Sequence, residues 1–138
     1  MSKVSVIGAG NVGAEVARRI AEKNLADVVL VDVVEGVPQG KALDMLQSAP
    51  VEGFSKKIEG TNDYSRIENS DVVVVTAGLA RKPGMTREDL VIKNGQIITE
   101  VSKNIKKYAP KAFVIMVTNP LDVMTQLCWK TTGFDNNR

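Results

Sequence analysis

Short runs of apolar residues alternate along the chain with longer segments in which apolar residues recur at helical spacing. The runs lie at residues 4–7, 28–31, 72–75 and 113–117 and are almost continuously apolar. Strands that are buried on both faces of a parallel sheet show this unbroken pattern, whereas half-exposed strands alternate between apolar and polar residues. A weaker run at residues 56–60 is expected to form an edge strand of the same sheet.

The longer segments are predicted to be helices, because their apolar residues recur three and four positions apart. They span residues 12–24, 39–50, 86–110 and 119–133. Asn24 tolerates the left-handed conformation at a helix end, and Pro50 is expected to stop the second helix. Thr86 is the expected N-cap of the third helix, with an acidic residue three positions later. Asn119 is the expected cap of the fourth helix, followed by a proline at the first helical position.

This alternation of strands and helices predicts an α/β domain with a doubly wound parallel sheet. The form of this domain that binds dinucleotides has six strands in the order 3-2-1-4-5-6. The chain supplies five candidate strands and then reaches the polar residues 135–138, where a sixth strand would start. We therefore expect residues 1–138 to be one domain that lacks the last strand and is a fragment of a longer protein.

The composition is that of one soluble globular domain. Of the 138 residues, 43% are hydrophobic and 25% are charged, a balance that supports one buried core. The formal net charge is +2 and no block of basic residues occurs, so no nucleic-acid partner is expected. No apolar run approaches the ~20 residues needed to cross a membrane, and the N-terminus resembles no secretion signal. A cytoplasmic protein without a membrane partner is expected.

The chain contains one cysteine and no histidine. A single cysteine excludes an intramolecular disulfide and a CxxC metal site, which fits a reducing compartment, and no metal site is expected. Cys128 lies between Leu127 and Trp129, so a buried structural thiol is favoured over a reactive one. The absence of histidine removes the side chain that most often transfers protons near neutral pH.

Residues 8–13 read GAGNVG, a GxGxxG motif that follows the first predicted strand and opens the first predicted helix. In this setting Gly8 permits a tight turn, Gly10 lets the backbone approach a pyrophosphate, and Gly13 lets the helix pack closely on the strand. The N–H groups at the start of the helix then face the phosphates. The motif predicts a Rossmann NAD-binding fold whose phosphate loop consists of Gly8, Ala9, Gly10, Asn11, Val12 and Gly13.

Asp32 ends the second predicted strand, where a carboxylate can accept hydrogen bonds from the adenosine ribose hydroxyls. A carboxylate there repels a 2′-phosphate, so NAD is favoured over NADP. The segments after the fourth and fifth strands should lie in the same crevice, near the ribose and nicotinamide. They are Thr76, Ala77 and Gly78, and Val117, Thr118 and Asn119. The alternative, a glycine turn near a solvated aspartate, leaves the joint placement of these residues unexplained.

The segment that follows the fourth strand reads TAGLARKPGMTR and carries Arg81 and Arg87. A guanidinium is permanently charged and matches a carboxylate through two hydrogen bonds, so two of them favour a small dianion. Pro83 and Gly84 suggest a hinge that would let the loop close over a substrate. From the residues alone, a solvated basic loop remains an alternative.

Together, GAGNVG, the aspartate that ends VVLVD, TAGLARKPGMTREDL, KNGQII and VTNPLDV resemble the lactate/malate dehydrogenase family over essentially the whole chain. The resemblance implies that Arg81 binds the distal carboxylate of malate or oxaloacetate, because lactate dehydrogenases carry glutamine there. It implies that Arg87 polarises the substrate carbonyl, a preorganised electrostatic role. It also implies that Asn94 contacts the cofactor and that Asn119 contacts both cofactor and substrate.

The implied reaction is the reversible, NAD-dependent oxidation of malate to oxaloacetate. Such a hydride transfer needs a group that takes or gives the hydroxyl proton. In the family this group is a histidine oriented by an aspartate, in a later part of the chain. We therefore predict that these 138 residues bind NAD but do not turn over malate. The alternatives are a non-catalytic NAD-binding regulatory module and a lactate or other 2-hydroxyacid dehydrogenase.

Self-association of the intact protein is also expected. A fifth strand without a further neighbour exposes a sheet edge, and such edges favour pairing with another chain. The family forms oligomers, so the resemblance implies a homodimer or a homotetramer.

Overall fold

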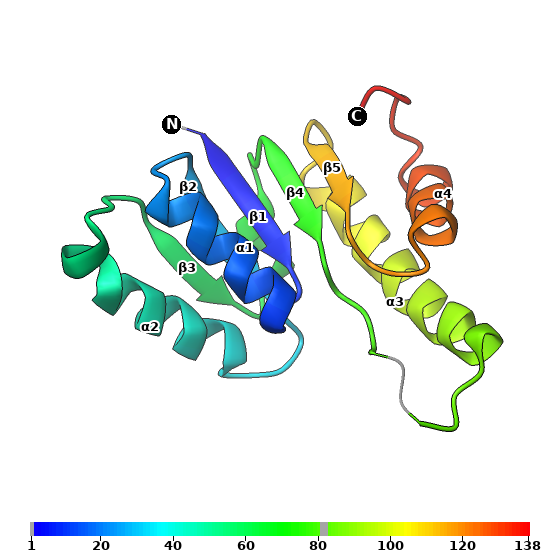
Figure 1. The fold of residues 1–138 in the computed structure, drawn as a ribbon. Helices are drawn as coiled ribbons and strands as arrows, with labels where there is room; N and C mark the ends of the chain where they lie inside the picture. Colours follow the sequence, from blue (N-terminus) through cyan, green and yellow to red (C-terminus); the bar gives the residue numbers. More distant parts are fainter. Residues whose placement is uncertain (1, 81–82) are drawn as a thin grey trace.

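Helices cover both faces of a parallel β-sheet in the computed structural model, which describes residues 2–80 and 83–138 (Figure 1). The sheet has five strands in the order β3-β2-β1-β4-β5, and every neighbouring pair is parallel. The strands are β1 (Lys3–Ile7), β2 (Asp27–Val31), β3 (Ile58–Thr61), β4 (Val72–Val75) and β5 (Phe113–Met116). The doubly wound fold predicted from the sequence is confirmed, and the weak run is the edge strand β3.

Each face of the sheet is covered by two helices. The helices are α1 (Asn11–Glu22), α2 (Val37–Glu52), α3 (Arg87–Tyr108) and α4 (Leu121–Thr132), and a short 3-10 helix, η1 (Tyr64–Ile67), precedes β4. Neighbouring side chains of a strand point to opposite faces. In β1, Val6 packs on the side of α1 and α2, whereas Ile7 packs on the side of α3 and α4. Because both faces are buried, the central strands read as unbroken apolar runs.

Several predicted helix ends are confirmed. Asn24 follows α1 in the left-handed conformation, with a φ of 53°. The Thr86 hydroxyl caps α3 by accepting a hydrogen bond from the Asp89 N–H at 3.0 Å, and the Asp89 carboxylate accepts one from the Thr86 N–H. These hydrogen bonds lower the pKa of Asp89. Gly133 ends α4 with a φ of 69°. Such caps depend on neighbouring residues in the sequence and can therefore be predicted from it.

Pro50 does not end α2, contrary to the sequence prediction. The helix runs on to Glu52 and ends at Gly53, which is left-handed. A proline this close to the end removes one backbone hydrogen bond, and the Gly53 N–H still closes the turn on the Ala49 carbonyl at 2.8 Å. The last turn therefore tolerates the proline.

Asn119 does not cap α4, and this prediction is also wrong. Pro120 takes the N-cap position with an extended backbone, so the helix begins one residue later than expected. The Asn119–Pro120 peptide bond is cis. The Asn119 carbonyl accepts a hydrogen bond from the Asn94 side chain in α3 at 2.8 Å. A contact between distant segments, which the local sequence does not encode, thus holds this residue.

Helices α3 and α4 pack against each other, and Gly95 of α3 faces Leu127 of α4. Helix α3 continues through Gly95 without a break, and a Cβ at this position would lie 3.7 Å from the Leu127 side chain. A methyl group at this position would therefore make an ordinary van der Waals contact with α4. Cys128 also lies on α4, where it is 4% exposed, and burial raises the pKa of its thiol. The predicted buried thiol is confirmed.

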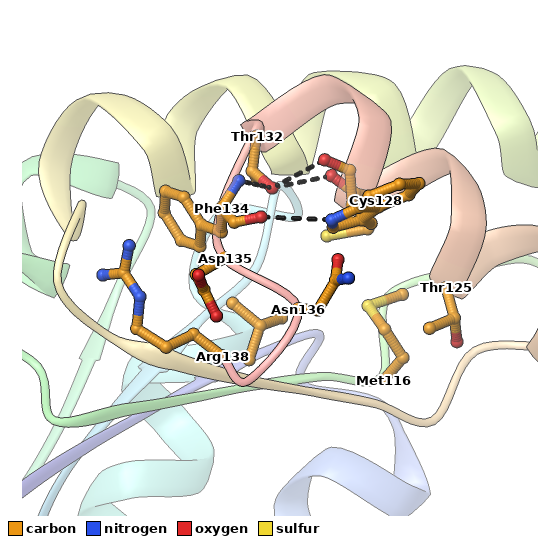
Figure 2. A pocket seen from close by; sticks show the side chains of 10 residues that line it. Met116, Thr125, Cys128, Thr132, Phe134, Asp135, Asn136 and Arg138 are labelled. Atoms are coloured by element: carbon orange, nitrogen blue, oxygen red, sulfur yellow. Dashed lines mark hydrogen bonds between the residues drawn. The ribbon is translucent and has the colours of Figure 1, made fainter.

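Within the described residues, β5 pairs with β4 alone and forms an edge of the sheet. Phe113 and Ile115 on this strand are 53% and 52% exposed. A pocket of about 310 Å³ lies between β5, α4 and the residues that follow α4 (Figure 2). Arg138 lies against the edge, because its carbonyl accepts a hydrogen bond from the Val114 N–H at 2.8 Å. Among the helices of the described ranges, none is long and apolar enough to cross a membrane.

Candidate functional site

The carboxyl ends of β1, β2 and β4 open into a cleft of about 680 Å³, and side chains of α3 line one of its walls. Ligands of open parallel sheets bind at the carboxyl ends of the strands where the strand order reverses, which here is between β1 and β4. A cleft of this volume is large enough for a small-molecule ligand. The predicted cofactor residues that line it are Gly8, Gly10, Asp32, Thr76, Ala77 and Gly78.

The glycine turn lies directly against the end of β4. Gly8 has a φ of 105°, which side-chain-bearing residues rarely adopt, and a Cβ there would lie 2.7 Å from the Ala77 backbone nitrogen. A Cβ on Gly13 would overlap the carbonyl oxygen of Gly8. By contrast, no described atom lies within 4 Å of the Cβ position of Gly10. The turn is therefore packed tightly from behind and open toward the cleft at Gly10.

Helix α1 begins at Asn11, and its N-cap residue is Gly10, which has no side chain to cap the helix. The N–H groups of a first helical turn have no partner within the helix, and the helix dipole adds a partial positive charge. Asn11 and Val12 are exposed, so this helix end is accessible. A pyrophosphate fits such a position because it accepts several hydrogen bonds and is negatively charged.

Asp32 reaches the glycine turn from the end of β2. Its Oδ2 accepts a hydrogen bond from the Ala9 N–H at 2.6 Å, and its Oδ1 accepts one from the Val34 N–H at 2.9 Å. Each carboxylate oxygen can accept a further hydrogen bond, so ribose hydroxyls can also be bound. Burial raises the pKa of Tyr64 to about 12, with smaller contributions from the charges of Asp32 and Glu100. These two carboxylates line the cleft and disfavour a 2′-phosphate there.

Two threonines join the loops at the strand ends. The Thr76 hydroxyl is within hydrogen-bonding distance of the Gly8 carbonyl, at 3.1 Å, and so links the end of β4 to the glycine turn. The Thr118 hydroxyl donates to the Ala77 carbonyl at 2.7 Å and links the end of β5 to the same loop. Thr118 is buried, and Val117 is 37% exposed. The loop after β4 is therefore hydrogen-bonded both to the glycine turn and to the loop after β5.

Asn94 lies beneath these loops and is 2% exposed. Its Oδ1 accepts a hydrogen bond from the Leu79 N–H at 2.8 Å, and its Nδ2 donates to the Asn119 carbonyl at 2.8 Å. The side chain thus ties α3 to the loops that follow β4 and β5. The cofactor contact implied for Asn94 stays a prediction, whereas its observed partners are protein groups.

The arginine loop is described in part. Arg81 and its neighbour Lys82 lie outside the described residues. Arg87 is the first residue of α3 and is exposed, and the capping box that starts at Thr86 fixes this end of the helix. Gly84 has a φ of 85°. The substrate contacts predicted for Arg81, Arg87 and Asn119 stay predictions.

Two residues at the site were not predicted from the sequence. Lys41, on α2, donates a hydrogen bond from its Nζ to the Ala9 carbonyl at 2.6 Å. Asn62, after β3, donates from its Nδ2 to the Asp32 carbonyl at 2.7 Å. Neither belongs to a sequence motif, because each acts on a residue more than twenty positions away. The pocket beside α4 (Figure 2) is lined by none of the predicted site residues that the structure describes.

The packing of the glycine turn generates a test of stability. We expect Gly13→Ala to lower the free energy of unfolding by roughly 1–3 kcal/mol, because the added methyl group overlaps the Gly8 carbonyl. Gly40→Ala, in α2, is the matched control, since no described atom lies within 4 Å of its Cβ position. It should raise the free energy of unfolding by about 0.5–1 kcal/mol through helix propensity. Urea unfolding followed by circular dichroism measures both, and equal stability of the two variants would contradict the packing.

Comparison with known proteins identifies the family of the chain. The family described as "lactate/malate dehydrogenase, NAD binding domain" matches residues 2–138. Malate dehydrogenases from Methanosarcina barkeri and Dehalococcoides mccartyi (strain 195) are 57% and 58% identical to the chain over 138 residues. These matches cover 100% of this chain and 45% of each relative. The chain thus spans less than half the length of these relatives.

Comparison with solved structures also identifies the lactate/malate dehydrogenase family. Malate dehydrogenase from Picrophilus torridus in its apo form matches with a TM-score of 0.93 and 47% identity, over 97% of this chain and 43% of that chain. Lactate dehydrogenase from Cryptosporidium parvum, complexed with lactic acid and nicotinamide adenine dinucleotide, matches with a TM-score of 0.93 and 46% identity, over 99% and 43% of the two chains. The chain belongs to the lactate/malate dehydrogenase family, matches its NAD-binding domain, and takes NAD as its cofactor.

Proposed function

We propose that the whole protein is a malate dehydrogenase that oxidises malate reversibly to oxaloacetate, and that this chain supplies its NAD site and substrate-binding loop. The observation that carries the proposal is the sequence position of two arginines: Arg81 falls between β4 and α3, and Arg87 is the first residue of α3. The segment that joins β4 to α3 leaves the sheet at the cleft where the glycine turn and Asp32 lie. Two permanently charged guanidinium groups in the sequence that follows β4 suit a substrate with two carboxylates.

Each part of the cleft has a proposed role toward the cofactor, whose nicotinamide ring supplies the hydride chemistry when it is bound. The glycine turn and the N-terminus of α1 hold the pyrophosphate, and Asp32 accepts hydrogen bonds from the adenosine ribose. The loops after β4 and β5 lie beside the nicotinamide ribose and ring. Asn94 and Thr118 hold these loops together through the hydrogen bonds to Leu79, Asn119 and Ala77.

The roles proposed for the substrate residues follow from charge. Arg81 binds the distal carboxylate, which distinguishes a dicarboxylate from lactate or pyruvate. Arg87 polarises the carbonyl oxygen and stabilises the negative charge that develops on it. Asn119, whose backbone carbonyl is fixed by Asn94, contacts substrate and cofactor from the opposite loop. In the sequence, Arg81 and Arg87 follow β4 and Asn119 follows β5.

We also propose that the intact protein is a cytoplasmic homodimer or homotetramer. The support for self-association is the family resemblance, because the sixth strand of the complete fold pairs with the edge of β5 at which Phe113 and Ile115 are exposed in this chain.

The 138-residue chain should bind NADH without catalysing its oxidation by oxaloacetate. The chain has no histidine, and a hydride transfer of this kind needs a group that supplies or takes the hydroxyl proton. Calorimetry measures the binding, and the absorbance of NADH in the presence of oxaloacetate measures turnover. Binding without a decline in absorbance is expected, whereas sustained turnover at enzymatic rates would refute the proposal that the proton-transfer group lies elsewhere in the protein.

Substrate choice tests the role of Arg81 in the intact protein. Arg81→Gln should lower kcat/KM for oxaloacetate by about tenfold to a hundredfold, because it removes a charge-assisted pair of hydrogen bonds. It should raise kcat/KM for pyruvate, because the second carboxylate is no longer required. Arg18→Gln, an exposed arginine on α1, is the control and should change neither value. A wild-type preference for pyruvate would favour a lactate dehydrogenase, and no activity with any 2-oxoacid would favour a regulatory module.

A further inference from the structure

Lys41 contacts the glycine turn from helix α2. It lies on α2, and its Nζ donates a hydrogen bond to the Ala9 carbonyl at 2.6 Å. Ala9 is the residue between Gly8 and Gly10, where the turn opens toward the cleft. An ammonium that donates to a carbonyl forms a charge-assisted hydrogen bond, which is stronger than a neutral one.

Helix α2 is held firmly enough to place this ammonium. Gly60 in β3 allows the start of α2 to approach, since a Cβ there would overlap the Pro38 carbonyl. The Gln39 side chain donates to Asn62 at 2.6 Å, and Asn62 donates in turn to the Asp32 carbonyl at 2.7 Å. The first turns of α2 are therefore hydrogen-bonded both to the Asp32 segment, through Asn62, and to the glycine turn, through Lys41.

Two side chains of opposite charge, Asp32 and Lys41, hold the backbone N–H and carbonyl groups of Ala9. The N–H of Ala9 donates to the Asp32 carboxylate at 2.6 Å, and its carbonyl accepts from the Lys41 ammonium at 2.6 Å. The preceding carbonyl, that of Gly8, lies 3.1 Å from the Thr76 hydroxyl. Because the Ala9 carbonyl and the Gly10 N–H belong to one planar peptide group, holding the carbonyl also fixes the direction of the Gly10 N–H. A preorganised donor set binds an anion more tightly than a mobile one, because less ordering accompanies binding.

We infer that Lys41 is a positioning residue for the pyrophosphate-binding turn: it holds the Ala9 carbonyl so that the N–H groups from Gly10 onward point at the cofactor phosphates. Its charge also adds to the positive potential at the N-terminus of α1. The inference rests on the proposed role of this turn in binding the cofactor pyrophosphate. Lys41 acts through Ala9, and no contact of Lys41 with the cofactor is required.

Two ligands distinguish binding at the glycine turn from binding in the rest of the cleft. ADP-ribose carries the pyrophosphate, whereas adenosine carries the base and ribose without any phosphate. Lys41→Met keeps the apolar part of the side chain and removes the donor. It should raise the Kd for ADP-ribose by about tenfold, the effect of losing one charge-assisted hydrogen bond, and leave the Kd for adenosine unchanged. Calorimetry on the purified chain gives the first value, and NMR titration gives the second.

Two further variants complete the test. Lys41→Arg retains a positive donor and should restore most of the affinity for ADP-ribose. Lys111→Met makes the same chemical change at an exposed residue after α3 and should leave both affinities unchanged. An unchanged Kd for ADP-ribose in Lys41→Met would overturn the inference. So would an equal loss for both probes or a failure to fold, because Lys41 would then support the whole domain. If the wild-type chain binds neither probe, the proposed cofactor site itself fails.

Discussion

The cofactor site depends on the close approach between the glycine turn and the end of β4. Gly8 and Gly13 allow this approach, because a Cβ at either position would meet Ala77 or the Gly8 carbonyl. The approach brings α1 to the cleft with its N-terminus directed at the point where the strand order reverses. A bulkier residue in the turn would move the helix away from β4 and separate the phosphate donors from the loops beside them.

Hydrogen bonds from side chains then connect the loops that this approach brings together. Thr76 contacts the Gly8 carbonyl, Thr118 reaches Ala77, and Asn94 joins Leu79 to Asn119. Each of these polar groups is partly or fully buried, so leaving one without a partner would cost about 1–3 kcal/mol. The described residues that these hydrogen bonds join are therefore positioned without a ligand, which reduces the ordering that accompanies binding.

The features that depend on neighbouring residues or on the burial of whole strands could be predicted from the sequence. The unbroken valine runs predicted strands buried on both faces, and the caps at Asn24, Thr86 and Gly133 follow from neighbouring residues. The features that it did not predict depend on contacts between distant segments. Asn119 is held by Asn94 rather than by its own helix, and Lys41 and Asn62 each act on a residue far away in the chain. Spacing along the sequence carries no signal for such pairs.

The most direct test of the account is to map NADH onto the chain by NMR. The backbone amide signals of uniformly 15N-labelled protein would be followed as NADH is added. We expect the largest shifts at the amides of Gly10 to Gly13, with further shifts around Asp32 and in the loops after β4 and β5. Shifts confined to the pocket beside α4 (Figure 2), or none with NADH at millimolar concentration, would contradict it.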